Sequence, residues 1–148
     1  DIMLTNAKKN NEQLVLLLID LDGFKEVNDH FGHKAGDNVL IKIANRLKTA
    51  IRKEDILIRL GGDEFVIAFN VADESRSEID YFVENLLNRF KTEIQLKDSN
   101  SVTIGSSIGI VVYPYDGETI GILIANADSA MYQAKREGKN RALYYRAA

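Results

Sequence analysis

The sequence contains no cysteine, which excludes a disulfide framework and a thiolate zinc site. It also lacks an apolar run long enough to span a bilayer, and no secretory signal is visible. Neither sign of charge dominates, because 19 basic and 22 acidic residues give a formal net charge of −3. This balance favours neither duplex DNA nor an anionic membrane as a partner. We therefore expect a cytoplasmic segment with no nucleic-acid partner and no membrane contact.

What is present is typical of one ordinary domain. The chain has 148 residues, of which 45% are hydrophobic, so it can bury a real core. No internal repeat or low-complexity segment divides it. Residues 1–13 are polar, and we interpret them as a segment leading into a domain that covers residues 14–148.

A continuous apolar run from Leu14 to Ile19 predicts a buried central strand. The run leads directly into Asp20, Leu21 and Asp22. Asp20 is thereby placed at the end of the strand, where ligand sites commonly lie.

A β-hairpin is predicted around the pair Gly61-Gly62. The flanking runs, Asp55–Ile58 and Phe65–Phe69, are rich in β-branched and aromatic residues, and glycine permits a tight turn. Asp63 and Glu64 follow the glycines at once. Taken alone, these acids are explained as well by a solvated hairpin tip as by a metal site.

The two acidic groups together favour the metal site. If the central strand pairs beside the hairpin, Asp20 and Asp63 would share one or two divalent cations, which prefer hard oxygen ligands. Carboxylates at the ends of neighbouring buried strands indicate a phosphoryl-transfer site.

Hydrophobic spacing predicts the other elements. Asn126 or Asp128 is the expected cap of the last helix, Gly138 follows its end, and Gly105 and Gly109 mark a bulge or close packing. Helices are expected at Phe24–Phe31, from Asp37 to about Ile51, and at Glu78–Glu93, Thr119–Ala125 and Ala127–Glu137, with further strands at Val102–Ile104, Ser107–Tyr113 and Leu143–Tyr145.

Three runs resemble one known family. Residues 61–65 read GGDEF, residues 20–37 fit the family's second signature, and residues 127–141 fit its third. Together they cover nearly the whole chain in the family's order. The chain therefore resembles a GGDEF domain, the catalytic domain of diguanylate cyclases.

The resemblance implies an α/β (α+β) fold: a palm-like sandwich with a central, mostly antiparallel five-stranded sheet surrounded by helices. It implies condensation of two GTP into cyclic di-GMP and two pyrophosphate, with two Mg²⁺ (or Mn²⁺) ions per half-site. Each domain would hold one GTP, so catalysis needs a two-fold homodimer. The alternative is a catalytically weak receptor or regulatory domain for GTP or cyclic di-GMP, against which the intact acids argue.

The resemblance also implies residue roles. The metal ligands would be Asp20, the Leu21 carbonyl, Asp63 and Glu64, with Asp63 also the general base. The triphosphate would be held by the N–H groups of Gly23, Phe24 and Lys25 at a helix N-terminus, and by Lys135 and Lys139. Without the resemblance, the two lysines are explained as cations that favour a helix C-terminus. The family favours arginine at Lys139, so a point charge replaces a bidentate fork there.

Guanine would be bound by Asn28 and Asp37. A carboxylate accepts from the guanine N1–H and N2 amino groups, and an amide can donate to O6 or N7. Taken alone, Asp37 is explained as a helix N-cap and Asn28 as a polar residue on an exposed helix face.

Arg52 and Asp55 form an R-x-x-D motif just before the hairpin. In many GGDEF domains this motif forms an inhibitory site for the product, cyclic di-GMP. The alternative is a polar turn with an exposed Arg52–Asp55 ion pair of little energetic value.

The N-terminal segment departs from the family pattern, because Leu4-Thr5 keeps only the Leu-Thr pair of its usual start. We expect the chain to be a piece of a longer protein, in which the family usually places a sensory module upstream.

Overall fold

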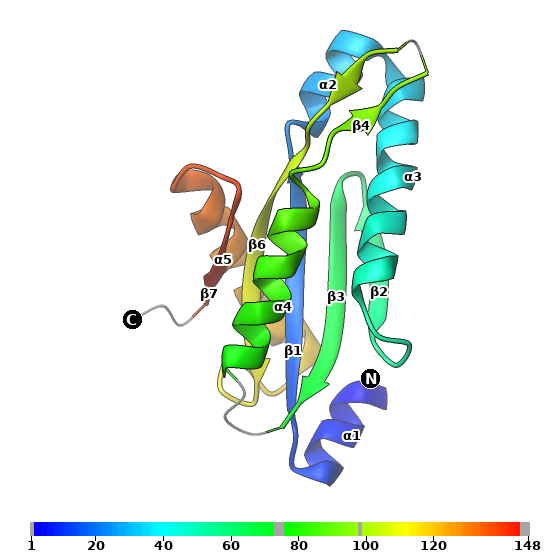
Figure 1. Ribbon diagram of the computed structural model, residues 1–148. Coiled ribbons are helices and arrows are strands. Elements are labelled where there is room, and N and C mark those ends of the chain that lie inside the picture. Colours follow the sequence, from blue (N-terminus) through cyan, green and yellow to red (C-terminus); the bar gives the residue numbers. More distant parts are fainter. Residues whose placement is uncertain (1, 73–75, 98, 146–148) are drawn as a thin grey trace.

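A five-stranded sheet forms the centre of the computed structural model, which describes residues 2–72, 76–97 and 99–145 (Figure 1). The strand order is β2-β3-β1-β6-β7. All neighbours are antiparallel except β6 and β7, which run parallel, so the predicted mostly antiparallel sheet is confirmed. The strands are β1 (Gln13–Asp22), β2 (Ile56–Gly61), β3 (Glu64–Val71), β6 (Gly105–Tyr113) and β7 (Arg141–Tyr144).

The central strand β1 is buried on both faces, which explains its continuous apolar run. Val15, Leu17 and Ile19 belong to one hydrophobic core, whereas Leu14 and Leu16 belong to a second core on the opposite face. Successive side chains of a strand point to opposite faces, so only a strand covered on both sides buries every residue.

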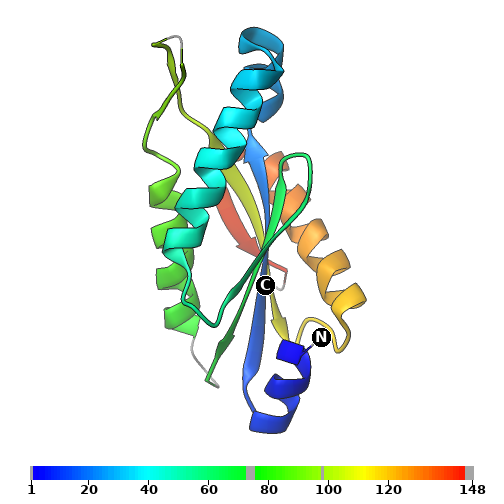
Figure 2. The same cartoon turned by 90° about the vertical axis from the view of Figure 1, so that its right-hand side faces the viewer.

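Helices cover both faces of the sheet (Figure 2). In that view α3 and α4 lie on one side and α5 and α1 on the other. None of the described helices is long and apolar enough to cross a membrane. The helices are α1 (Ile2–Asn10), α2 (Phe24–Phe31), α3 (His33–Ala50), α4 (Arg76–Arg89) and α5 (Ile120–Arg136), and a separate small sheet joins β4 (Ile94–Gln95) to β5 (Ser101–Val102).

The N-terminal segment is more ordered than its polar composition predicts. Within α1, Leu4 and Ala7 are buried in the second core, against the sheet. Two well-spaced apolar residues were enough to fix this helix, because the sheet supplies the rest of the contact.

Two predicted helix boundaries are wrong. The expected pair of helices after residue 119 is one helix, α5, capped by the side chain of Thr119, which accepts from Ile122 N at 3.2 Å. Asn126 instead donates to the carbonyl of Asp116 at 2.7 Å, so it supports the preceding turn rather than a helix start. Likewise α3 begins at His33, because Gly32, with a φ of 93°, interrupts the helical conformation after α2. Asp37 therefore lies inside α3 and is not its N-cap.

Gly109 provides a close contact between the sheet and α5. A Cβ atom there would lie 2.0 Å from the Ala127 carbonyl oxygen and 2.6 Å from the Met131 nitrogen, both rigid backbone atoms. We expect Gly109→Ala to destabilise the domain by about 3 kcal/mol, because β6 and α5 must move apart. Equilibrium urea unfolding measures the loss.

Gly121 is the matched control, since it lies in α5 and a Cβ atom there would meet nothing within 4 Å. Gly121→Ala should be neutral or stabilise by up to about 1 kcal/mol. Equal unfolding midpoints for the two variants would contradict the assigned contact.

Candidate active site

The two predicted acidic groups lie side by side. In the antiparallel register of β1 and β3, Asp20 is opposite Glu64, and the Leu21 N–H donates to the Asp63 carbonyl at 3.1 Å. The end of β1, the tip of the β2–β3 hairpin and the end of α5 all point toward the same end of the molecule (Figures 1 and 2).

The hairpin tip is held by its own backbone and one arginine. Gly61 and Gly62 have φ of 151° and 51°, conformations that residues with a side chain rarely adopt. Arg59 donates from Nε and Nη2 to the Gly62 carbonyl, at 3.1 and 2.8 Å. The acids that follow therefore start from a fixed turn.

Two carboxylates of this cluster, Asp20 and Glu64, have raised pKa values. The pKa of Asp20 is raised to about 6, mainly by burial; the hydrogen bond from Lys135 lowers it, and the neighbouring charge of Asp63 raises it. The pKa of Glu64 is also raised, first by burial and then by the charges of Asp128 and Asp63. Crowded acids with raised pKa values are typical of functional sites, where a cation relieves the repulsion.

Lys135 of α5 is the cation already present. Its ammonium lies 3.0 Å from Asp20 Oδ2 and 3.3 Å from Asp22 Oδ1. Lys135 thus meets acids that are far from it in sequence, while its predicted contact with the substrate phosphates stays a prediction.

Asp22 and Ser107 are site residues that the sequence interpretation did not single out. Asp22 is buried and accepts from the Ser107 hydroxyl at 2.8 Å. The spacing of Asp20 and Asp22 contained a signal, because residues i and i+2 of a strand lie on one face. Ser107 is opposite Asp20 in the β1–β6 register, a pairing that no local pattern indicates.

The cluster fits a hard divalent cation. Asp20 Oδ1 is buried and has no hydrogen-bond partner among the described residues, which is an available oxygen ligand beside two further carboxylates. No three acidic or histidine side chains of the described residues form a metal group by themselves. Backbone and substrate oxygens would therefore have to complete the coordination.

The start of α2 provides backbone donors next to the acids. Gly23 is its N-cap residue and makes no side-chain cap bond, and the first N–H to bond back, from Val27, reaches the Gly23 carbonyl at 3.2 Å. The N–H groups of the first turn have no partner within the helix, which suits an anion. Phe24 is buried there and Lys25 is exposed.

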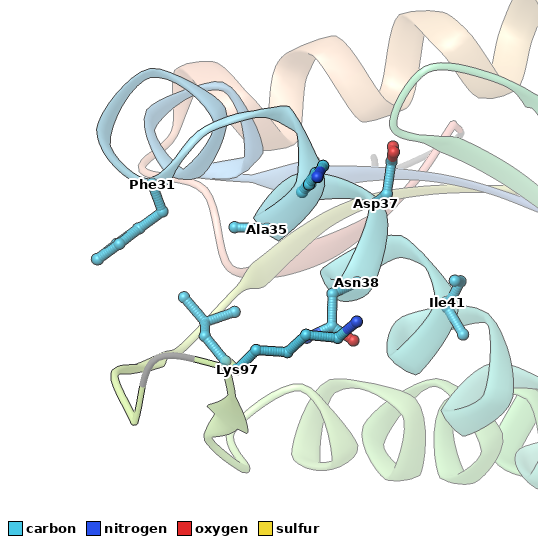
Figure 3. Close-up of a pocket in the computed structure, with 8 residues that line it drawn as sticks. Phe31, Ala35, Asp37, Asn38, Ile41 and Lys97 are labelled. Atoms are coloured by element: carbon cyan, nitrogen blue, oxygen red, sulfur yellow. The ribbon is translucent and has the colours of Figure 1, made fainter.

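Asn28 and the residue before Asp37 are in contact. Gly36 lies so close to Asn28 that a Cβ atom on it would be 1.8 Å from Asn28 Oδ1. Asp37 is exposed. It lines a pocket of about 430 Å³ together with Phe31 and Lys97, and its side chain points away from those two residues (Figure 3). The fold thus places Asn28 of α2 against Gly36 of α3, the residue next to Asp37.

Lys139 lies in the turn that joins α5 to β7. Its backbone N–H donates to the Ala134 carbonyl at 3.0 Å, and Gly138 follows the helix end as predicted. The structure places Lys139 just beyond the end of the helix that carries Lys135, with an exposed side chain.

The R-x-x-D motif has one buried residue, Asp55, and one exposed residue, Arg52. The Asp55 side chain is 0% exposed, and its carboxylate accepts from the Arg52 backbone N–H at 2.8 Å and from Arg52 Nη2 at 3.1 Å. Asp55 raises the pKa of Arg52 through the side-chain hydrogen bond. The ion pair of the alternative interpretation does form, but its Asp55 side is buried, whereas the Arg52 side chain stays 51% exposed.

The fold and the strand-end acids together define an α/β sandwich of the kind found in nucleotide cyclases and polymerase palms. The family model described as "Diguanylate cyclase, GGDEF domain" matches residues 1–141. The chain belongs to the GGDEF domain family.

Several characterised proteins are similar to the chain. It is 41% identical over 134 residues to the bifunctional diguanylate cyclase/cyclic di-GMP phosphodiesterase MucR of Pseudomonas aeruginosa, covering 90% of this chain and 19% of MucR. It is 40% identical over 140 residues to diguanylate cyclase TpbB of the same species, and this match covers 92% of this chain and 31% of TpbB. The chain thus spans less than a third of either relative.

Solved GGDEF domains share the fold. The crystal structure of the GGDEF domain of PA1120 (YfiN or TpbB) matches with a TM-score of 0.90 and 38% identity, covering 95% of this chain and 87% of that one. The GGDEF domain of DgcB from Caulobacter crescentus, in complex with c-di-GMP, matches with a TM-score of 0.87 and 25% identity, covering 98% and 85%.

Proposed function

We propose that this domain is a diguanylate cyclase that condenses two GTP molecules into cyclic di-GMP and releases two pyrophosphates. The observation that carries the proposal is the pairing of Asp20 with Glu64 at the strand ends, beside Lys135 and with one Asp20 oxygen available. The relatives named as diguanylate cyclases support the same reaction class.

The substrate is bound by groups at the same end of the sheet. The N–H groups of Gly23, Phe24 and Lys25 donate hydrogen bonds to the triphosphate, and Lys135 and Lys139 add positive charge. A neighbouring pair, Asn28 and Asp37, binds the guanine edge.

The acids hold the metal. Asp20, the Leu21 carbonyl, Asp63 and Glu64 would hold two Mg²⁺ (or Mn²⁺) ions, which would stabilise charge on the α-phosphate and lower the pKa of the attacking 3′-hydroxyl. Asp63 takes the proton of that hydroxyl. The 3′-oxygen forms a bond to the α-phosphorus of the other GTP as pyrophosphate leaves.

Two domains are needed, because each provides one half-site with one GTP. A two-fold homodimer brings the 3′-hydroxyl of each nucleotide to the α-phosphate of the other. An upstream sensory module would control this encounter.

The rival function is a receptor for GTP or cyclic di-GMP without turnover. Incubation with GTP and Mg²⁺, followed by chromatography of the nucleotides, decides between them. Cyclic di-GMP supports the cyclase, whereas calorimetric GTP binding without product supports the receptor.

We also propose that Arg52 binds cyclic di-GMP as an inhibitor. Asp55 accepts from Arg52 Nε and Nη2, and the Asn70 carbonyl also accepts from Nη2. The guanidinium side chain is still 51% exposed, and its remaining N–H groups would bind a phosphate or the guanine Hoogsteen edge. Arg52→Ala should lose cyclic di-GMP affinity by about tenfold or more while GTP affinity is kept, as measured by calorimetry.

Lys53→Ala is the matched control, since Lys53 is an exposed cation one residue away. It should bind cyclic di-GMP like the wild type. Unchanged affinity in Arg52→Ala would mean that the motif only forms a turn.

A further inference from the structure

Asp22, the last residue of β1, is 7% exposed, yet its carboxylate binds groups from three other segments. Its Oδ1 accepts from Ser107 Oγ on β6 at 2.8 Å and from Lys135 Nζ on α5 at 3.3 Å. Its Oδ2 accepts from the backbone N–H of Asn140 at 2.9 Å. Both oxygens are engaged by protein donors, in contrast to Asp20, whose Oδ1 is buried without a partner among the described residues.

A buried carboxylate is tolerated only when it is paired and hydrogen-bonded, and Asp22 satisfies both conditions. It therefore provides a fixed negative charge for Lys135, whose long stem would otherwise sample many rotamers. The ammonium is shared with Asp20, at 3.0 Å. Once Asp20 is committed to a divalent cation, Asp22 is the charge that still holds the ammonium at the site.

The same carboxylate fixes the turn that carries Lys139. Lys139 and Asn140 have φ of 64° and 50°, a left-handed conformation that side-chain-bearing residues adopt only at a cost. The Asp22–Asn140 hydrogen bond holds this turn against β1. The Asn140 side chain fits only because Gly105 has none: a Cβ atom on Gly105 would lie 1.5 Å from Asn140 Oδ1.

We propose that Asp22 is the positioning residue for phosphate binding: it holds the Lys135 ammonium and the Lys139 turn where the phosphates of a guanine nucleotide bind. The assignment rests on the proposed function, because it takes the nucleotide as the ligand of the acidic site. Asp22 acts through the two lysines and ligates no metal, since its oxygens are already occupied.

The test is calorimetric binding of GDP and of guanosine, with Mg²⁺ present, to the wild type and to Asp22→Asn. GDP keeps phosphates and cannot release pyrophosphate, and the substitution keeps the shape of the side chain while removing its charge. GDP affinity should fall by about tenfold or more, and guanosine affinity should stay the same. Removing a negative charge near the phosphates would by itself tighten GDP binding. A weaker GDP affinity in Asp22→Asn therefore indicates that Asp22 positions the lysines.

Two further variants separate positioning from stability. Asp116→Asn changes another buried aspartate, which accepts from Val112 N–H at the opposite end of β6, and should leave GDP affinity unchanged. In a Lys135→Ala background, most of the loss caused by Asp22→Asn should disappear, because its main partner is gone. Unchanged or tighter GDP binding by Asp22→Asn overturns the proposal, as does an equal loss for guanosine or weakened Mg²⁺ binding without nucleotide.

The same proteins, assayed with GTP, distinguish the two ideas. If the wild type binds GDP but forms no cyclic di-GMP, the cyclase function is overturned. The positioning role of Asp22 is then judged from the GDP affinities alone. A wild type that forms cyclic di-GMP, with the same KM and GDP affinity in Asp22→Asn, overturns the positioning role alone. A wild type that binds no GDP overturns both.

Discussion

Replacing Asp63 with alanine should lower the rate of cyclic di-GMP formation by about 10²–10³-fold, the cost of removing one preorganised group that stabilises transition-state charge. Asp63 follows the fixed Gly61-Gly62 turn and its carbonyl is bonded to Leu21, so its carboxylate is aimed at the strand end. Asp20→Ala should have a similar effect, because the available oxygen beside Lys135 is lost. Initial rates of product formation by chromatography measure both.

The fold should survive these substitutions. The negative charge of Asp63 raises the pKa of both Asp20 and Glu64, so its removal relieves repulsion in the metal-free domain. The thermal unfolding midpoint of Asp63→Ala should therefore equal or exceed that of the wild type. Glu84→Ala, an exposed acid on α4, is the control and should keep full activity. Product formation by both Asp20→Ala and Asp63→Ala would exclude the metal site.

The second large effect concerns selectivity for the guanine base of the nucleotide. We expect GTP to be favoured over ATP, by up to roughly 10⁴-fold if the bound guanine buries the Asp37 carboxylate, because adenine presents an acceptor at N1 where Asp37 needs a donor. Asp37→Ala should weaken GTP binding and narrow this ratio. Calorimetric titration with each nucleotide gives the ratio directly, and comparable wild-type affinities for ATP and GTP would contradict the role of Asp37.

Gly36 offers an independent approach to the same site. A Cβ atom on Gly36 would meet only the Asn28 side chain, which is able to rotate away, so Gly36→Ala should fold and lose the Asn28 contact to guanine. Gly121→Ala, where nothing lies within 4 Å, is the matched control. Wild-type selectivity in Gly36→Ala would place the guanine elsewhere.

Part of this site was predictable because its signals are local. The run Leu14–Ile19 predicts a buried strand by itself, and Gly61-Gly62 predicts the turn, since both depend on neighbouring residues only. The adjacency of their acids followed from one assumption, that the two strands pair. The register of Asp20 with Glu64 bears that out.

Boundaries were less predictable, because competing local signals have similar strength. Asn126 and Asp128 both resemble helix caps, yet the chain continues through them as α5. Thr119 is the cap because the turn before it is held by Asp116, whose carbonyl binds Asn126. A contact made after folding therefore decided that neither Asn126 nor Asp128 caps a helix.

The sequence by itself determined the strand-end acids and the turn that presents them, because apolar periodicity and glycine placement act over a few residues. Its resemblance to the GGDEF family implied the class of fold. Only the tertiary structure decided the partners of the charged groups. Lys135 meets Asp20 and Asp22 across more than a hundred residues, and Asp55 is buried by the turn that was expected to expose it. The reason is physical: the state of a charge depends on the burial and neighbours that surround it, and these exist only once the sheet and α5 have packed together.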